Sequence, residues 1–134
     1  MSWTPEVITA SGAPAPRGPT SAHAVRVGPL LFVTGQSGRR PGEDAYLVDA
    51  REHARQTMEN VKAIVEAGGS RMDLVVKRTI VARDFDLYRQ VIDVIESYFP
   101  RPVASTSLRG GLMLEDMLLE VEVVAAVAGA DDAH

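Results

Sequence analysis

The sequence lacks cysteine entirely, which excludes both a disulfide framework and a thiol nucleophile. Aromatic residues make up only 5 % of the chain, so few side chains are available on which the bases of a single-stranded nucleic acid could stack. No window is long and apolar enough to span a membrane, and residues 1–19 contain no apolar segment of signal-peptide length. We therefore expect a cytoplasmic protein that has no membrane partner.

Positive charge is also scarce, because 14 Lys and Arg stand against 18 Asp and Glu and leave a net charge of −4. Nucleic-acid binding depends on neutralising phosphates, and the 14 Lys and Arg are scattered along the sequence, so nucleic acid is disfavoured as a partner. His23 has no second His or Cys at ligand spacing, so no metal site is predicted. With 134 residues, 46 % of them apolar, the chain is expected to form one domain, 1–134, around its own core.

Short β-rich runs and turn residues describe the first third of the chain. Residues 10–21 are rich in Pro, Gly and Ser, and we expect an irregular loop there. The runs 24–27 and 30–34 are separated only by Gly28-Pro29, a spacing that predicts a hairpin. Residues 45–48 are a candidate for one further short strand.

Helical periodicity marks two segments. Residues 50–67 carry an apolar stripe at spacings of three and four, follow Asp49 as a helix cap, and stop at Gly68-Gly69. A second helix is predicted from Leu87 to Tyr98, with Asp86 as its cap. Its inner face is predicted to consist of Val91, Val94 and Ile95.

The remaining segments complete an α+β pattern. Further strands are expected at 74–82, 103–109 and 117–128, with an irregular N-terminal segment at 1–17 and a frayed tail at 129–134. The economical arrangement is a five- to six-stranded mixed sheet with two helices packed on one face. The last strand carries apolar residues on both of its faces, so the face that the helices leave uncovered predicts a homo-oligomer.

Four blocks of sequence resemble the RidA/YjgF family, also called endoribonuclease L-PSP, over roughly residues 10–126. They are Ala13-Pro14 with Gly18-Pro19-Thr20-Ser21, Val27-Gly28 through Gln36, the helical segment from Gln56 to Gly69, and Asp73 to Lys77 with Tyr98-Phe99-Pro100. Each block is weak alone, but four in order at matching spacing indicate the fold. The resemblance implies a chorismate-mutase-like single domain and a homotrimer with sites in clefts between subunits, where no metal or organic cofactor is needed.

The resemblance also implies an activity and its residues. Enzymes of the family hydrolyse reactive imines and enamines, such as 2-aminoacrylate, to a 2-keto acid and ammonia. Carried onto this chain, Glu120 would orient the attacking water, Thr34-Gly35 would form a wall of the pocket, and Ser105-Thr106 would supply backbone contacts across the interface. The expected partners are a small-molecule ligand and further copies of the chain.

Three positions depart from the family pattern: its carboxylate-binding arginine is Ala104, its tyrosine is Thr20, and an asparagine of its second helix is Ile92. An Arg–carboxylate fork makes two charge-assisted bonds, each contributing about 1.5–3 kcal/mol. Their loss would weaken transition-state binding by roughly two to four powers of ten, so an altered choice of substrate is expected. Arg109 is five positions from Ala104 and should lie on the opposite strand face, which makes Arg17 the better candidate for a replacement cation.

Several interpretations remain open at this point. The chain is a hydrolase with altered substrate choice, a non-catalytic trimer that binds a metabolite or partner, or an endoribonuclease, the last disfavoured by acidity and scarce aromatics. Glu120 and Glu122 share a strand face and could equally be solvated charges, as Arg17 could be a surface residue. His23 is interpreted as structural or surface-exposed, and His53, in the first turn of its helix, is expected to face solvent. Met113 and Met117 are interpreted as gap-filling core or interface residues.

Overall fold

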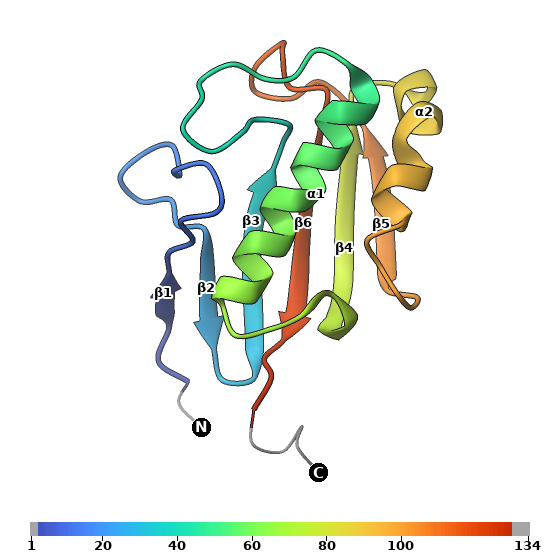
Figure 1. The fold of residues 1–134 in the computed structure, drawn as a ribbon. Helices are drawn as coiled ribbons and strands as arrows, with labels where there is room; N and C mark the ends of the chain where they lie inside the picture. The colour runs from blue at the N-terminus through green and yellow to red at the C-terminus, as the bar shows by residue number, and fades with distance from the viewer. Residues whose placement is uncertain (1–2, 130–134) are drawn as a thin grey trace.

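Six strands form one mixed sheet in the computed structural model, which describes residues 3–129 (Figure 1). The strands are β1 (Glu6–Ile8), β2 (Ala24–Val27), β3 (Leu30–Gln36), β4 (Val75–Ala82), β5 (Ala104–Arg109) and β6 (Leu119–Ala126). The helices are α1 (Ala50–Ala67) and α2 (Phe85–Glu96), with a short 3-10 turn at Met72–Leu74 before β4.

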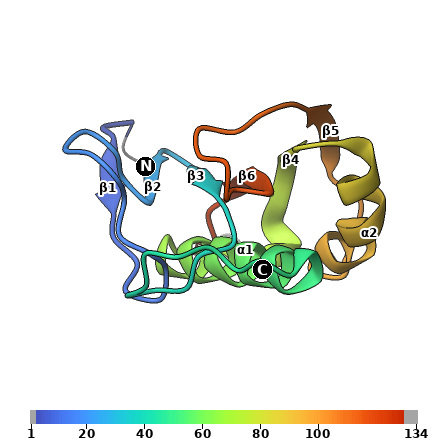
Figure 2. The same ribbon diagram turned by 90° about the horizontal axis from the view of Figure 1, so that it is seen from above.

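The sheet order β1-β2-β3-β6-β4-β5 places the last strand in its centre. All neighbouring pairs are antiparallel except β4 and β5, which are parallel and are joined through α2. Seen from above, both helices lie on the same side of the sheet (Figure 2). The α+β arrangement expected from the sequence, with both helices on one face, is therefore confirmed.

Strand β6 shows how the sheet divides its two faces. Leu119, Val121 and Val123 are buried beneath the helices, whereas the intervening Glu120 and Glu122 point to the helix-free face. The buried side packs against the apolar stripe of α1, and Met58, Val61, Ile64 and Val65 are among its fully buried residues. Burial of these side chains is the main source of stability for the two-layer arrangement.

Both helices begin at an aspartate cap. Asp49 accepts a hydrogen bond from the backbone N–H of Glu52 at 3.0 Å, as predicted. For α2 the predicted start is wrong by two residues, because Asp84, not Asp86, accepts from the N–H of Leu87 at 2.8 Å. Asp86 lies within the first turn, where its negative charge still favours the positive end of the helix dipole.

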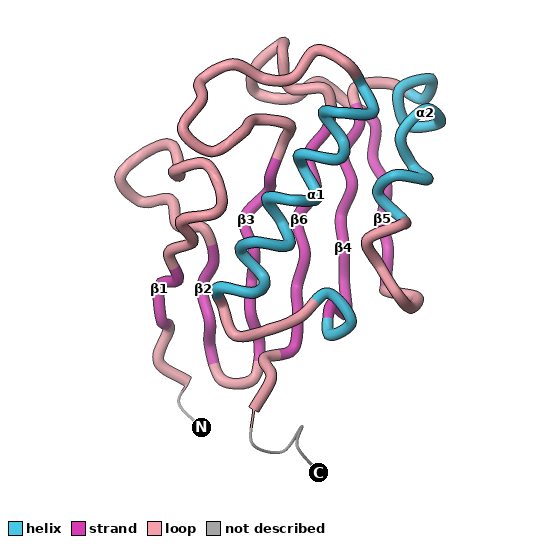
Figure 3. The backbone as a smooth tube through the Cα atoms, viewed as in Figure 1, coloured by secondary structure: helices cyan, strands magenta, loops and turns pink. Residues whose placement is uncertain are grey.

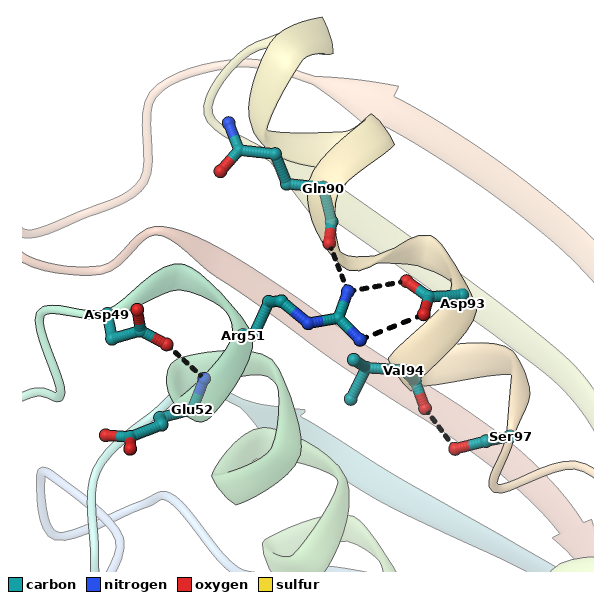
Figure 4. Close-up of polar contacts among 7 residues, drawn as sticks. All are labelled: Asp49, Arg51, Glu52, Gln90, Asp93, Val94 and Ser97. Atoms are coloured by element: carbon teal, nitrogen blue, oxygen red, sulfur yellow. Dashed lines mark hydrogen bonds and ion pairs between the residues drawn. The ribbon is translucent and has the colours of Figure 1, made fainter.

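The helices are tied together on their outer surface by one fork-like ion pair (Figure 4). The two Nη atoms of Arg51 donate to the two carboxylate oxygens of Asp93 at 2.8 and 3.0 Å, and Nη1 also donates to the carbonyl of Gln90 at 2.8 Å. The guanidinium of Arg51 lowers the pKa of Asp93 through this hydrogen bond. The bidentate geometry fixes the relative position of the helices more than it adds to stability, because the pair is exposed.

Three further expectations from the sequence need correction or qualification. Residues 45–48 form no strand; a single bridge joins Tyr46 to Arg39. The segment 1–17 is not wholly irregular, because β1 pairs with β2 along the sheet edge. Of the predicted tail, residues 130–134 lie outside the described residues. In the described range, neither helix is long and apolar enough to cross a membrane.

Candidate functional site

An irregularity in β3 shapes the helix-free face where the predicted site residues meet. The pairing of β3 with β6 shifts between Val33 and Gln36, both of which are buried. The shift leaves Thr34 and Gly35 together between them, with Thr34 exposed. Such bulges re-aim side chains and are common next to functional sites.

Gly35 gives Glu120 the space that it occupies. A Cβ placed on Gly35 would lie only 2.6 Å from Cδ of Glu120, so the glutamate side chain lies across the bare glycine backbone. Any side chain at position 35 would displace the carboxylate. The two residues come from neighbouring strands of the central sheet and form one unit, which the sequence alone could not have shown.

The environment of Glu120 changes its acidity. The residue is half-buried, and burial raises the pKa of its carboxyl group; the nearby charge of Glu122 raises that pKa further. A carboxyl group with a raised pKa exchanges protons closer to neutral pH than an exposed glutamate does. The arrangement is therefore suited to orienting a water molecule and to moving a proton.

A cavity of about 370 Å³ opens beside this unit. It is bounded by the loops 9–23 and 37–49, which lie side by side (Figure 3), and by the loop between β5 and β6. The two long loops are tied together where Nη2 of Arg39 donates to the carbonyl of Ala15 at 3.2 Å. Thr34, Gly35 and Arg17 all line the cavity, so the structure brings three of the sequence-predicted residues together.

The cations of the cavity differ in how they are held. Arg39 is fixed by two backbone carbonyls, those of Ala15 and Glu43, at 3.2 and 3.1 Å. Arg17 is exposed and forms no ion pair within residues 3–129. No Asp or Glu side chain in the described part of the chain lines the cavity. Its charged wall is therefore positive, which favours an anionic group in a ligand.

Ala104 lies far from Glu120 within one chain. It pairs with Lys77 of β4, which pairs with Val124 of β6, and Glu120 stands four residues earlier on that strand. Four residues at about 3.3 Å and two strand spacings of about 4.8 Å separate the two Cα atoms by on the order of 16 Å. One small molecule cannot touch both residues of the same chain.

The other predicted positions are also spread out. Ser105 and Thr106 lie with Ala104 on the exposed edge strand β5, where Ser105 accepts a hydrogen bond from Nε of Arg78 at 2.8 Å. Thr20 is exposed in the loop next to the cavity but does not line it. Ile92 is half-buried on α2 and packs against the core in the helix layer. Arg109 pairs with Ala82 and lies on the helix side of the sheet, opposite to Ala104 as predicted.

Sequence reasoning missed a buried polar network that holds the floor of the cavity. His53 was expected to face solvent, but it is fully buried. Its Nδ1 donates to the carbonyl of Leu47 at 2.7 Å, and its Nε2 accepts from the N–H of Gly38 at 2.9 Å. Ser37 Oγ lies 3.0 Å from the same Nε2 and donates to the carbonyl of Leu119 at 2.5 Å. The backbone N–H already occupies the imidazole lone pair, so this pair positions the cavity wall and does not activate the hydroxyl.

Asn60 extends the same network from the next turns of α1. Its Nδ2 donates to the carbonyls of Arg39 and Ser37 at 2.8 and 3.2 Å, and its Oδ1 accepts from Gln56 at 2.8 Å. His53, Thr57, Asn60 and Ile64 are spaced by four, three and four residues, and all are buried. That periodicity was available in the sequence. It would have identified the polar members as buried residues that hold the loop.

We expect the unfolding free energy of the protein to fall as pH drops below about 6.5. Burial lowers the pKa of His53 from 6.5, so the folded state keeps the ring neutral while the unfolded chain takes up a proton. This stability is present above pH 6.5 and is lost as pH falls towards the lowered folded pKa. Urea unfolding at several pH values between 5 and 8 measures how steeply the free energy of unfolding depends on pH.

The His53→Ala variant supplies the control for this expectation. It should lose about 1–3 kcal/mol at pH 7.5 for each buried N–H that it leaves unpaired, and its pH slope should be shallower. A variant that keeps the full slope of the natural protein would show that another group is responsible.

Chemistry that depends on a bound metal has no obvious donor set here. Among the described residues there is no group of three or more His, Cys, Asp or Glu side chains that could hold a metal ion. The polar groups of the cavity wall are guanidinium, hydroxyl and backbone groups and the carboxamide of Gln36.

Comparison with known proteins places the chain in a family. The family described as Endoribonuclease L-PSP matches residues 10–127. A RutC family protein from Pyrococcus horikoshii is 33 % identical over 123 residues, which cover 90 % of this chain and 96 % of that protein. A 2-iminobutanoate/2-iminopropanoate deaminase from Salmonella typhimurium is 32 % identical over 124 residues, with 90 % of this chain and 96 % of that protein covered.

Solved structures share the same fold. The yeast protein YEO7 matches with a TM-score of 0.87 at 26 % identity, covering 93 % of this chain and 100 % of its own. TdcF of E. coli, solved with bound serine, matches with a TM-score of 0.80 at 26 % identity, covering 92 % of this chain and 99 % of its own. The fold, the family match over nearly the whole chain and the identity to full-length relatives agree, and the chain belongs to the RidA/YjgF family, also described as Endoribonuclease L-PSP.

Proposed function

We propose that this protein hydrolyses the C=N bond of a small imine, or of the enamine in equilibrium with it, and that its choice of substrate differs from that of relatives with an arginine at position 104. The observation that carries this proposal is the half-buried carboxyl of Glu120, which has a raised pKa and lies across Gly35, a residue of the cavity wall. A carboxylate of this kind orients a water molecule towards an electrophilic carbon.

The reaction needs only water and proton transfers. The water oxygen adds to the imine carbon, and one of the water protons passes by way of Glu120 to the nitrogen, which gives a carbinolamine. The second proton then passes from the new hydroxyl to the nitrogen as the C=O bond forms and the C–N bond breaks. The products are a carbonyl compound and ammonia, so no oxidant, reductant or metal enters the balance. Thr34 and the backbone at Gly35 line the space in which the substrate would lie.

Relatives support this reading of the cavity. Several are named 2-iminobutanoate/2-iminopropanoate deaminase at about one-third identity, and one related structure holds serine. An amino acid and a 2-imino acid are similar in size and charge. A small anionic molecule is therefore the ligand class that we propose for this chain, with Arg17 as its cation.

We further propose that the site is completed by a second copy in a homotrimer. Ala104 and Glu120 of one chain are too far apart for one small ligand, and the edge strand β5 exposes all six of its residues. A neighbouring copy would present its Ala104, Ser105 and Thr106 to the cavity beside Glu120. Sedimentation velocity measures the number of chains in the assembly. A protein that stays monomeric at micromolar concentration would contradict the proposed homotrimer.

Ammonia release from freshly generated imines tests the activity directly. An amino-acid oxidase generates the imine from alanine or leucine, and release is compared with and without the protein. Acceleration that is lost in Glu120→Gln supports the proposal. No acceleration on any imine, from a folded protein, would favour the non-catalytic binding alternative.

The pKa of Glu120 should determine the pH at which the rate falls on the acid side, or acid limb, of the pH–rate profile. Because the charge of Glu122 raises the pKa of Glu120, the Glu122→Gln variant should shift that limb to lower pH. The exposed Glu66→Gln on α1, on the other side of the sheet, should leave it unchanged. A limb that stays in place in Glu122→Gln would show that Glu120 does not set it.

A further inference from the structure

The loop between β5 and β6 presents apolar side chains to the candidate site. Met113, Leu114 and Met117 line the same cavity as Thr34 and Arg17. The loop arches over the helix-free side of the sheet (Figure 2). These three residues are here called the apolar wall; two of them, Met113 and Met117, were interpreted from sequence as core or interface residues.

The exposure of the apolar wall argues against a role in the core. Met113 is 90 % exposed and Leu114 is 43 % exposed. Large apolar side chains that gather around a cavity and remain in water mark a binding surface. Methionine is well suited to such a surface because its flexible thioether adapts to ligands of different shape.

The charged side chains of the cavity wall are cationic. Arg17 and Arg39 line the cavity, and no acidic side chain of residues 3–129 does. A ligand that matches both these cations and the apolar wall carries an anionic group and an apolar group. Glu120 does not line the cavity itself, but its carboxylate lies across Gly35, which does.

The volume of the cavity exceeds the needs of the smallest substrates. The cavity has a volume of about 370 Å³. An imine with only a methyl side chain would leave the apolar wall in contact with water. A side chain as long as that of leucine or methionine would reach it.

We propose that the apolar wall is a specificity-determining surface, which selects 2-imino acids with a long apolar side chain over 2-iminopropanoate. This inference rests on the proposed hydrolase function and names its substrate class. Each additional buried CH₂ should raise kcat/KM about fourfold. The imine of leucine, with three more carbons than that of alanine, should be preferred by about tenfold to sixtyfold.

The double variant Met113→Ser/Met117→Ser tests the role of the wall. The ratio of kcat/KM for the leucine and alanine imines should fall by about tenfold. Val48→Ser is the matched control, because Val48 is 91 % exposed and does not line this cavity. A natural protein that prefers the alanine imine, or a variant with an unchanged ratio, would overturn the inference and leave the proposed function standing.

Ligand binding separates the inference from the activity. Calorimetry with the stable products, 4-methyl-2-oxopentanoate and pyruvate, measures selectivity even where no imine is hydrolysed. At least tenfold tighter binding of the larger acid, lost in the double variant, supports the apolar wall. Equal binding of the two acids, or a double variant that changes only its oligomeric state, would assign these side chains to contacts between copies of the chain and overturn the inference.

Discussion

The Ala104→Arg variant is expected to hydrolyse 2-iminopropanoate faster than the natural protein by roughly two to four powers of ten in kcat/KM. The guanidinium would make two charge-assisted hydrogen bonds to the substrate carboxylate, each contributing about 1.5–3 kcal/mol. Since about 1.4 kcal/mol is a tenfold change, two such bonds account for the range. Ammonia release from the imine, generated in place, is the measurement.

The side chain at position 104 has room to act without disturbing the fold. Ala104 is exposed on the edge strand and faces away from the helices, so its replacement requires no repacking of the core. Ala104→Met has similar length without charge and should leave the rate near that of the natural protein. If the natural protein already matches the arginine variant, another cation must hold the carboxylate, and Arg17 is the first to replace.

The Glu120→Gln variant should lose roughly two to four powers of ten of whatever imine hydrolysis the protein performs, the range typical of a positioned acid–base group. Its unfolding free energy at pH 7 should not fall. Burial raises the pKa of Glu120, so the ionised side chain is destabilising at neutral pH, and the neutral amide removes that cost. Activity and urea unfolding measured on one preparation check both expectations.

Glu122→Gln is the matched control for this variant. It lies two residues further along the same face of β6 and is more exposed, so it should retain most of the activity at neutral pH. A loss of the same size in both variants would indicate that the two carboxylates act through the negative charge that they give to this face of the sheet, and that Glu120 has no specific role. Retained activity in Glu120→Gln would remove Glu120 from the chemistry.

Features that depend on neighbours in the sequence were predictable. The hairpin of β2 and β3 follows from two β-rich runs around Gly28, whose φ of +55° suits a glycine in the turn. Helix α1 could be predicted from its cap, Asp49, and from the apolar stripe along one of its faces. The start of α2 was misplaced because two aspartates precede the same apolar stripe, and only the hydrogen bond to Leu87 shows which one is the cap. Strand β1 has three residues and owes its existence to its pairing with β2.

The candidate site was predictable in its members but not in its arrangement. The resemblance pointed to Glu120, Thr34 and Gly35, while the bulge that joins them depends on how β3 pairs with β6, about ninety residues away along the chain. The burial of His53 was missed because its polar side chain was not considered part of the buried face of α1, although its spacing places it there. The exposed Met113 could not be assigned to the cavity without the path of its loop.

The central place of β6 also bears on how the chain folds during its synthesis. This strand is made after the other five, yet β3 and β4 have no partner on their inner edges until it arrives between them. A nascent chain that lacks residues 119–126 therefore presents two open strand edges and an unsealed core beneath α1. Formation of the sheet must wait for contacts between distant parts of the sequence, which makes folding slow relative to a helical bundle and exposes the unfinished chain to association with others.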